Sequence, residues 1–166
     1  MRGYSALRRG RFSEPGATYF LTICTAGSRP GLTDETTAKA IDAEIDRLAL
    51  DASWELRAVT LMPDHLHLLV RLGGRLTVSQ CVGRLKAKTK AALAGGGIAW
   101  QDTFHDHKLV PDDAVQSVVH YIFMNPYRAR LIPVDATWPW FRLGADEAQW
   151  FAPLYAENVA LPEWLG

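Results

Sequence analysis

Two histidines separated by one apolar residue are the first feature of this sequence that could do chemistry. His65 and His67 lie in LMPDHLHLLV, residues 61–70, whose apolar run is typical of a buried strand. Because successive side chains of a strand point to opposite faces, both imidazoles would share one face, and Leu66 and Leu68 the other. Such a pair could bind one metal ion together with ligands from elsewhere in the chain. Taken alone, this short pattern is more often the polar face of a half-buried strand.

A tyrosine and an asparagine form the second candidate group. Tyr121 and Asn125 lie four residues apart on a helix predicted from Asp112 to Met124 or slightly further, so the phenol and the amide share one side. The apolar stripe of this helix is Val115, Val118, Val119 and Ile122. Each polar residue also has an ordinary explanation. Tyr121 could lie at the rim of the core with its hydroxyl in water, and Asn125 could cap a new helical turn that begins at Pro126.

The elements that must position these residues follow from periodicity and turn signals. Strands are predicted at residues 17–25, 54–61, 65–72 and 104–110, and helices from Thr33 or Asp34 to 50 and from Thr77 or Ser79 to 94, before the Tyr121 helix. This order predicts an α+β fold, ferredoxin-like, with a mostly antiparallel four-stranded sheet and helices packed on one face. Residues 1–16 would form a basic arm, 17–132 the functional domain, and 133–166 a Trp- and Pro-rich tail that packs on the body.

Composition limits the class of protein. The chain has 166 residues, 48% of them hydrophobic, which suits one globular domain with a real core. No apolar run approaches the roughly 20 residues of a membrane span, and the basic N-terminus lacks the apolar segment of a signal peptide. Cys24 and Cys81 have unrelated positions and are expected to be reduced core thiols. The expected localisation is the cytoplasm, with no membrane partner.

The formal net charge is zero, but it is unevenly distributed. Residues 1–31 carry five Arg and one Glu, residues 32–64 three basic and eight acidic groups, and residues 65–94 six basic groups and no acid. Asp42, Glu44 and Asp46 place the acidic block on the polar face of the first helix. This pattern predicts a two-sided molecule, with an acidic back and one face suited to phosphates.

Taken together, the motifs resemble those of a known family. MPDHLH at 62–67, WQDTFHDHKLV at 100–110 and YIFMNPYRARL at 121–131 occur in the order found in the HUH single-tyrosine transposases. They resemble most closely the REP-associated tyrosine transposases, which are domesticated relatives of insertion-sequence transposases. RRGRFSEPGATYFLT at 8–22 and WPW at 138–140 are similar too. The resemblance covers residues 10–140, whereas residues after about 145 contribute little.

The resemblance implies a role for each candidate. His65, His67 and Asn125 fall on the ligands of a divalent metal, magnesium or manganese, and Tyr121 falls on the nucleophile. The implied activity nicks and rejoins single-stranded DNA at hairpins of repetitive elements, through a 5′-phosphotyrosine that frees a 3′-hydroxyl. The sequence departs from the family at 127–130, where Arg130 replaces an expected Gly. No residue is an obvious base for the phenol, and the candidates His105, His107 and His120 are ranked as surface or structural residues.

The expected partner is single-stranded or hairpin DNA, bound by a monomer in preference to a homodimer and in association with the nucleoid. The residues predicted to contact it are basic: Arg8, Arg9, Arg11, Arg84, Lys86, Lys88, Lys90 and Arg128. Tyr4, Phe12 and Trp100 are candidates for stacking on unpaired bases.

Two other functions remain open from the sequence. One is a non-catalytic module that binds single-stranded DNA or RNA. The other is a metal-dependent phosphodiesterase that uses water, in which Tyr121 would be incidental. A covalent protein–DNA adduct would distinguish the transposase reaction from both.

Overall fold

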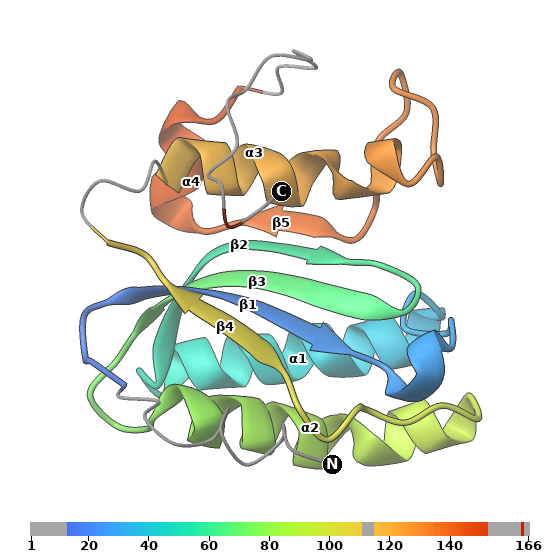
Figure 1. Ribbon diagram of the computed structural model, residues 1–166, viewed down its shortest axis with the longest axis horizontal. Helices are drawn as coiled ribbons and strands as arrows, with labels where there is room; N and C mark the ends of the chain where they lie inside the picture. Colours follow the sequence, from blue (N-terminus) through green and yellow to red (C-terminus); the bar gives the residue numbers. More distant parts are fainter. Residues whose placement is uncertain (1–12, 111–114, 153–163, 165–166) are drawn as a thin grey trace.

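A five-stranded antiparallel sheet with helices on both faces forms the body of the protein (Figure 1). The structure is a computed structural model, and it describes residues 13–110, 115–152 and 164. The strands are β1 Thr18–Cys24, β2 Trp54–Leu61, β3 His65–Leu72, β4 His105–Lys108 and β5 Phe141–Leu143, in the order β4-β1-β3-β2-β5. The helices are α1 Glu35–Leu50, α2 Val78–Gly95, α3 Val115–Arg128 and α4 Ala145–Trp150, with a short 3-10 helix at Ala26–Ser28. Among the described helices, none is long and apolar enough to cross a lipid bilayer.

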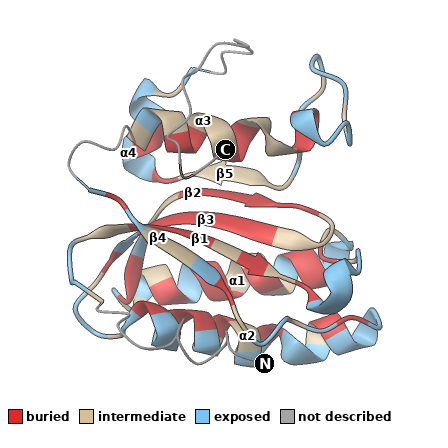
Figure 2. Cartoon of the chain, in the orientation of Figure 1, coloured by how far each residue is buried: buried red, intermediate tan, exposed pale blue. Residues whose placement is uncertain are grey.

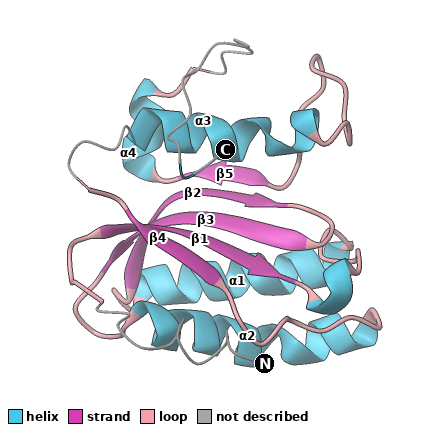
Figure 3. Ribbon diagram, viewed as in Figure 1, coloured by secondary structure: helices cyan, strands magenta, loops and turns pink. Residues whose placement is uncertain are grey.

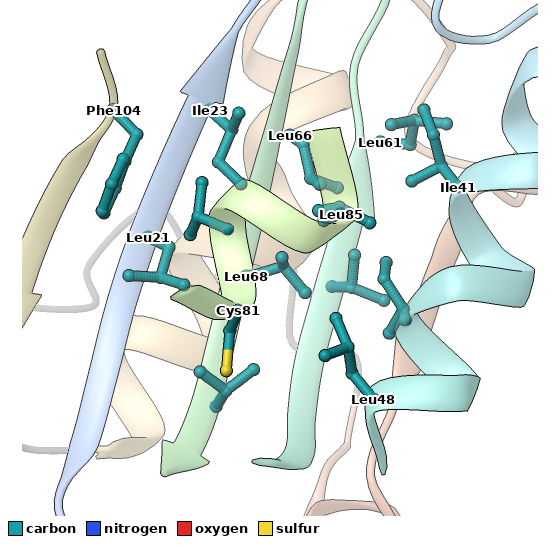
Figure 4. Close-up of a cluster of buried hydrophobic side chains, with 14 of the residues drawn as sticks. Leu21, Ile23, Ile41, Leu48, Leu61, Leu66, Leu68, Cys81, Leu85 and Phe104 are labelled. Carbon is teal, nitrogen blue, oxygen red and sulfur yellow. The ribbon is translucent and has the colours of Figure 1, made fainter. Parts of the chain in front are cut away.

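Side-chain alternation along the strands builds two separate cores. The sheet lies between helices on its two faces (Figure 3), and much of β2 and β3 is buried (Figure 2). Leu66 and Leu68 of β3 join the larger core under α1 and α2, which also contains Leu21, Ile41 and Leu85 (Figure 4). Their neighbour Leu69 points to the other face, where it packs with Phe20 of β1, Ala58 of β2 and the apolar stripe of α3. One face of the sheet therefore carries α1 and α2, and the other carries α3.

Two parts of the fold prediction are wrong. The sheet has five strands instead of four, because residues of the tail add β5 to the free edge of β2 through the pairs Ala58↔Leu143 and Thr60↔Phe141. The helices lie on both faces instead of one, because α3 has its own apolar partners in the second core. The α+β class and the antiparallel sheet agree with the prediction, whereas the ferredoxin-like description stays a prediction.

The boundaries of the central elements agree closely with those read from the sequence. The two strands that form the β2–β3 hairpin have the predicted bounds. Thr77 caps α2 through a reciprocal capping box with Gln80. The fourth strand is shorter than predicted, at His105–Lys108, and α3 continues past Asn125 and Pro126 to Arg128. The predicted start of that helix at Asp112 lies outside the described residues.

The described part of the tail packs on both cores. The Trp138 indole donates a hydrogen bond to the Leu61 carbonyl at 3.1 Å, and Trp140 packs against the larger core. Beyond β5, helix α4 buries Glu147, which accepts a hydrogen bond from Arg57 Nε at 2.7 Å. These contacts hold the tail beside α3, where the Phe151 ring lies 5.2 Å from that of Phe123.

The prediction that Glu44 belongs to an exposed acidic face of the first helix is wrong. This residue is buried between α1 and α2. Its carboxylate accepts hydrogen bonds from Arg84 Nε at 2.7 Å and from Arg47 Nη1 at 3.2 Å. Arg84 also pairs with Asp51, which follows α1. A carboxylate can be buried at such a place only when basic groups compensate it, so Arg84 stabilises the packing of the two helices.

We therefore expect Arg84→Ala to reduce the free energy of unfolding by about 1–3 kcal/mol, because the buried Glu44 carboxylate loses a charged partner. Lys88, which is exposed on the same helix, provides the matched control, and Lys88→Ala should cost less than about 0.5 kcal/mol. Urea unfolding of both variants measures the difference. Equal losses would contradict a structural role for Arg84.

Candidate active site

His65 and His67 lie side by side on the face of the sheet that carries α3. Their ring centroids are 4.7 Å apart. His67 is 5% exposed and is paired on both sides in the sheet, with Thr22 of β1 and Thr60 of β2. The side chain of His65, at the start of the strand, is 24% exposed. The two imidazoles thus share one face while Leu66 and Leu68 enter the opposite core, as strand alternation predicts.

Each imidazole is oriented through its Nδ1 atom. His65 Nδ1 lies 2.7 Å from Asp64 Oδ1, and His67 Nδ1 lies 3.0 Å from Thr22 Oγ1. Because an ionised carboxylate only accepts hydrogen bonds, His65 donates through Nδ1 in this pair. Ligating histidines in proteins are commonly held by such a bond, with the other ring nitrogen facing the metal. Thr22 and Asp64 were not identified from the sequence.

Burial and, to a smaller extent, the neighbouring His65 lower the pKa of His67 to about 3, although a side-chain hydrogen bond with Asn125 opposes the shift. His67 is therefore neutral at physiological pH. The neutral imidazole is the form that binds metal ions.

Tyr121 and Asn125 lie over these histidines on α3. The Tyr121 ring centroid is 5.6 Å from that of His67 and 6.0 Å from that of Phe20. Asn125 Nδ2 donates a hydrogen bond to the Tyr121 carbonyl at 3.2 Å. Since α3 continues through Pro126, the alternative that Asn125 caps a new helical turn is wrong. The spacing of four residues instead gives the phenol and the amide one side of the helix, next to His67.

A cleft of about 430 Å³ opens beside Tyr121. It is lined by Phe20, Thr22, His67, His105, Asp106, His107, Tyr121 and Trp164. His105 and His107 reach it because β4 pairs with β1 through Thr22↔His105 and Phe20↔His107. From the sequence both histidines were candidates for the base, with a surface or structural role ranked higher. Only the register between strands brings them there, and no local pattern encodes that register.

His120, the other candidate base, does not line the cleft. Its ring lies 5.2 Å from that of Phe151, and burial lowers its pKa. Its position one residue before Tyr121 turns it toward the tail, about 100° around the helix from the phenol.

Of the basic residues predicted to bind DNA, Arg128 lies at the site. Its guanidinium carbon is 5.6 Å from the centroid of the Tyr121 ring. Arg8, Arg9 and Arg11, like the predicted stacking residues Tyr4 and Phe12, lie outside the described residues.

The basic residues of α2 are not brought to the site, because α2 covers the opposite face of the sheet (Figure 1). These residues are Arg84, Lys86, Lys88 and Lys90. Arg84 is engaged by carboxylates, and Lys86 Nζ donates hydrogen bonds to the carbonyls of Gln101 and Thr103 at 2.7 and 3.1 Å. Trp100 packs on the same core and donates to Thr89 Oγ1 at 2.8 Å, so its predicted role in stacking on bases does not fit its position.

A metal at this site would depend on Asn125. Within the described ranges, no three His, Cys, Asp or Glu side chains converge as a ligand set. His65 and His67 offer two imidazoles, and the Asn125 side chain bonded to His67 offers an amide oxygen. Such a nitrogen and oxygen donor set suits manganese and other transition ions better than magnesium, which prefers oxygen ligands. The residues present therefore fit a divalent metal.

Comparisons with known proteins identify the family of this chain. The family model described as "Transposase IS200 like" matches residues 15–125. The chain is 24% identical over 145 residues to the REP-associated tyrosine transposase of Escherichia coli (strain K12), and the match covers 87% of each sequence.

Two solved structures share the fold. A REP-associated tyrosine transposase bound to a REP hairpin superposes with a TM-score of 0.73 at 21% identity, over 94% of both chains. The tRNA(His) guanylyltransferase of Saccharomyces cerevisiae has a TM-score of 0.52 at 10% identity, over 79% of this chain and 68% of that one. At these identities the likeness concerns the fold alone. The family match, in contrast, covers most of the chain, including His65, His67, Tyr121 and Asn125, and the chain therefore belongs to the IS200-like transposase family.

Proposed function

We propose that this chain is a metal-dependent transposase-like nuclease that nicks and rejoins single-stranded DNA at hairpins of repetitive elements through a phosphotyrosine on Tyr121. The observation that carries the proposal is the position of Tyr121, whose ring lies 5.6 Å from that of His67 and lines a cleft with it. The similar structure bound to a REP hairpin supports hairpin DNA as the partner.

His65, His67 and Asn125 would hold the divalent metal, magnesium or manganese. Its chemistry would be to neutralise charge on the non-bridging oxygens of the scissile phosphate. Thr22 and Asp64 keep the two imidazoles oriented for this role through their bonds to Nδ1.

In the proposed reaction, Tyr121 transfers the strand and Arg128 assists it. Tyr121 Oη attacks phosphorus, a bond forms between them, and the bond from phosphorus to the 3′ oxygen breaks. The phenolic proton passes to water and the departing 3′ oxygen takes one from water, so the products are a 5′-phosphotyrosine and a free 3′-hydroxyl. The new ester keeps the energy of the broken one, so a strand can be rejoined without ATP. Arg128, next to the Tyr121 ring, supplies positive charge near the reacting phosphate.

The site also supports action as a monomer. The two histidines, the asparagine and the tyrosine all come from one chain and contact one another within it. No residue of a second copy is needed to complete the set, so we propose that a single chain carries out the reaction.

Replacing Tyr121 with Phe tests the nucleophile. The change removes one oxygen and almost no volume, so the variant should fold and bind hairpin DNA like the wild type but form no covalent adduct. A denaturing gel of labelled hairpin DNA with manganese measures this, and wild type should show a band shifted by the mass of one protein. Tyr127, which is buried and hydrogen-bonded to the Ala136 carbonyl, provides the control position, so Tyr127→Phe should still give the adduct.

An adduct from Tyr121→Phe, or release of a 5′-phosphate by wild type without any adduct, would contradict the proposal. The second result would favour a phosphodiesterase that uses water. Binding without cleavage or adduct would favour the non-catalytic module.

Asp64 provides a test of the metal. Asp64→Ala should raise the manganese concentration needed for half-maximal adduct formation by about 10-fold, because His65 loses the partner that orients it. His65→Ala should remove the metal-dependent part of the rate. Asp102→Ala, which removes an exposed carboxylate outside the cleft, serves as the control. If the manganese dependence is the same for wild type and Asp64→Ala, the proposed orienting role is wrong.

A further inference from the structure

The indole of Trp164 lies in the cleft beside Tyr121. It stacks on the imidazole of His107, with ring centroids 3.7 Å apart and planes 14° from parallel. Its centroid is also 5.7 Å from that of Phe20, with the planes at 53°. A flat aromatic ring therefore occupies a place next to the proposed reaction site, on a platform made by β4 and β1.

The platform is continuous with the reacting residues. Phe20 and His107 are directly paired between β1 and β4, so their side chains rise from the same face of the sheet. On its other side Phe20 stacks on His67, with centroids 5.3 Å apart and planes at 23°, and it meets Tyr121 edge to face at 6.0 Å. The place taken by the indole is thus separated from the nucleophile by a single ring.

Resting on the proposed function, we propose that His107 and Phe20 form a subsite for one unpaired nucleobase of the DNA substrate, and that Trp164 occupies this subsite in the free protein. An indole and a purine are both flat bicyclic aromatic rings of similar size. Every base offers such a face, and stacking on aromatic side chains is the usual way in which proteins hold unpaired bases. A base held here would belong to a nucleotide close to the phosphate that Tyr121 attacks.

Replacing Trp164 and replacing His107 should change the affinity for DNA in opposite directions. Trp164→Ala removes the competing ring, so it should strengthen the binding of DNA with unpaired flanks. His107→Leu in the Trp164→Ala protein removes the platform at similar volume, so it should weaken binding about 5-fold or more. His107→Phe in the same protein restores an aromatic face and should keep the affinity within about 2-fold of the Trp164→Ala protein.

The experiment measures DNA binding by fluorescence anisotropy at one salt concentration, with Tyr121→Phe in every protein so that no cleavage occurs. The probe is a DNA hairpin with unpaired flanks on both sides. A series of probes replaces one unpaired nucleotide at a time by an abasic site. At one position, the abasic site should weaken binding to the Trp164→Ala protein and should also remove the difference between His107→Leu and His107→Phe.

Two results would overturn the subsite. One is an equal affinity of the His107→Leu and His107→Phe proteins for the intact probe, and the other is a difference between them that every abasic probe preserves. Should His107→Leu fail to fold, the Trp164→Ala protein alone still decides, because one abasic position must weaken its binding about 5-fold or more while its neighbours do not. The adduct assay on wild type is independent of this, so failure of the subsite and failure of the proposed function are distinguishable.

Discussion

The alternation of side chains along β3 is the constraint on which the site depends. The strand is paired on both sides, with β1 and with β2, so its register is fixed by two hydrogen-bonded ladders. Leu66 and Leu68 fill the core under α1 and α2, and His65 and His67 face α3. A slip of one residue would move both imidazoles into the apolar core and expose the leucines, at the cost of unpaired buried polar groups. The register that folds β3 into the sheet therefore also places the two histidines.

The position of the tyrosine depends on apolar packing in the same way. The apolar stripe of α3 packs on Ala58 of β2 and Leu69 of β3, which lie on the α3 side of the sheet. This stripe consists of Val118, Val119 and Ile122. With that stripe against the sheet, the helical period of 3.6 residues turns Tyr121 and Asn125 toward His67. The second core thus holds the phenol of Tyr121 and the amide of Asn125 against the histidine pair before any substrate arrives, and in the proposed reaction this pre-organisation would lower the entropic cost.

Sequence periodicity was sufficient for the parts of the site that lie within single elements. It gave the bounds of β2 and β3, the shared face of His65 and His67, and the shared side of Tyr121 and Asn125. It failed where partners are distant in the chain. The pairing of β1 with β4 brings His105 and His107 to the cleft. β5, a strand of three residues, forms the edge of the sheet next to β2. Neither leaves a local signal, because register between strands is set by tertiary packing.

The distribution of charge in space could not be predicted from the sequence either, and this distribution affects how DNA would be bound. Within the basic block at 65–94, Lys88 and Lys90 are exposed, but Arg84 neutralises the buried Glu44 and Lys86 donates hydrogen bonds to the carbonyls of Gln101 and Thr103 before β4. Arg84 and Lys86 stabilise the fold on the face away from the site. Arg128, in contrast, comes from a segment with no excess of basic residues and lies against Tyr121. In the proposed reaction, a cation beside the Tyr121 ring would act on the phosphate under attack. Its contribution would therefore concern the reacting bond more than the overall affinity for a strand.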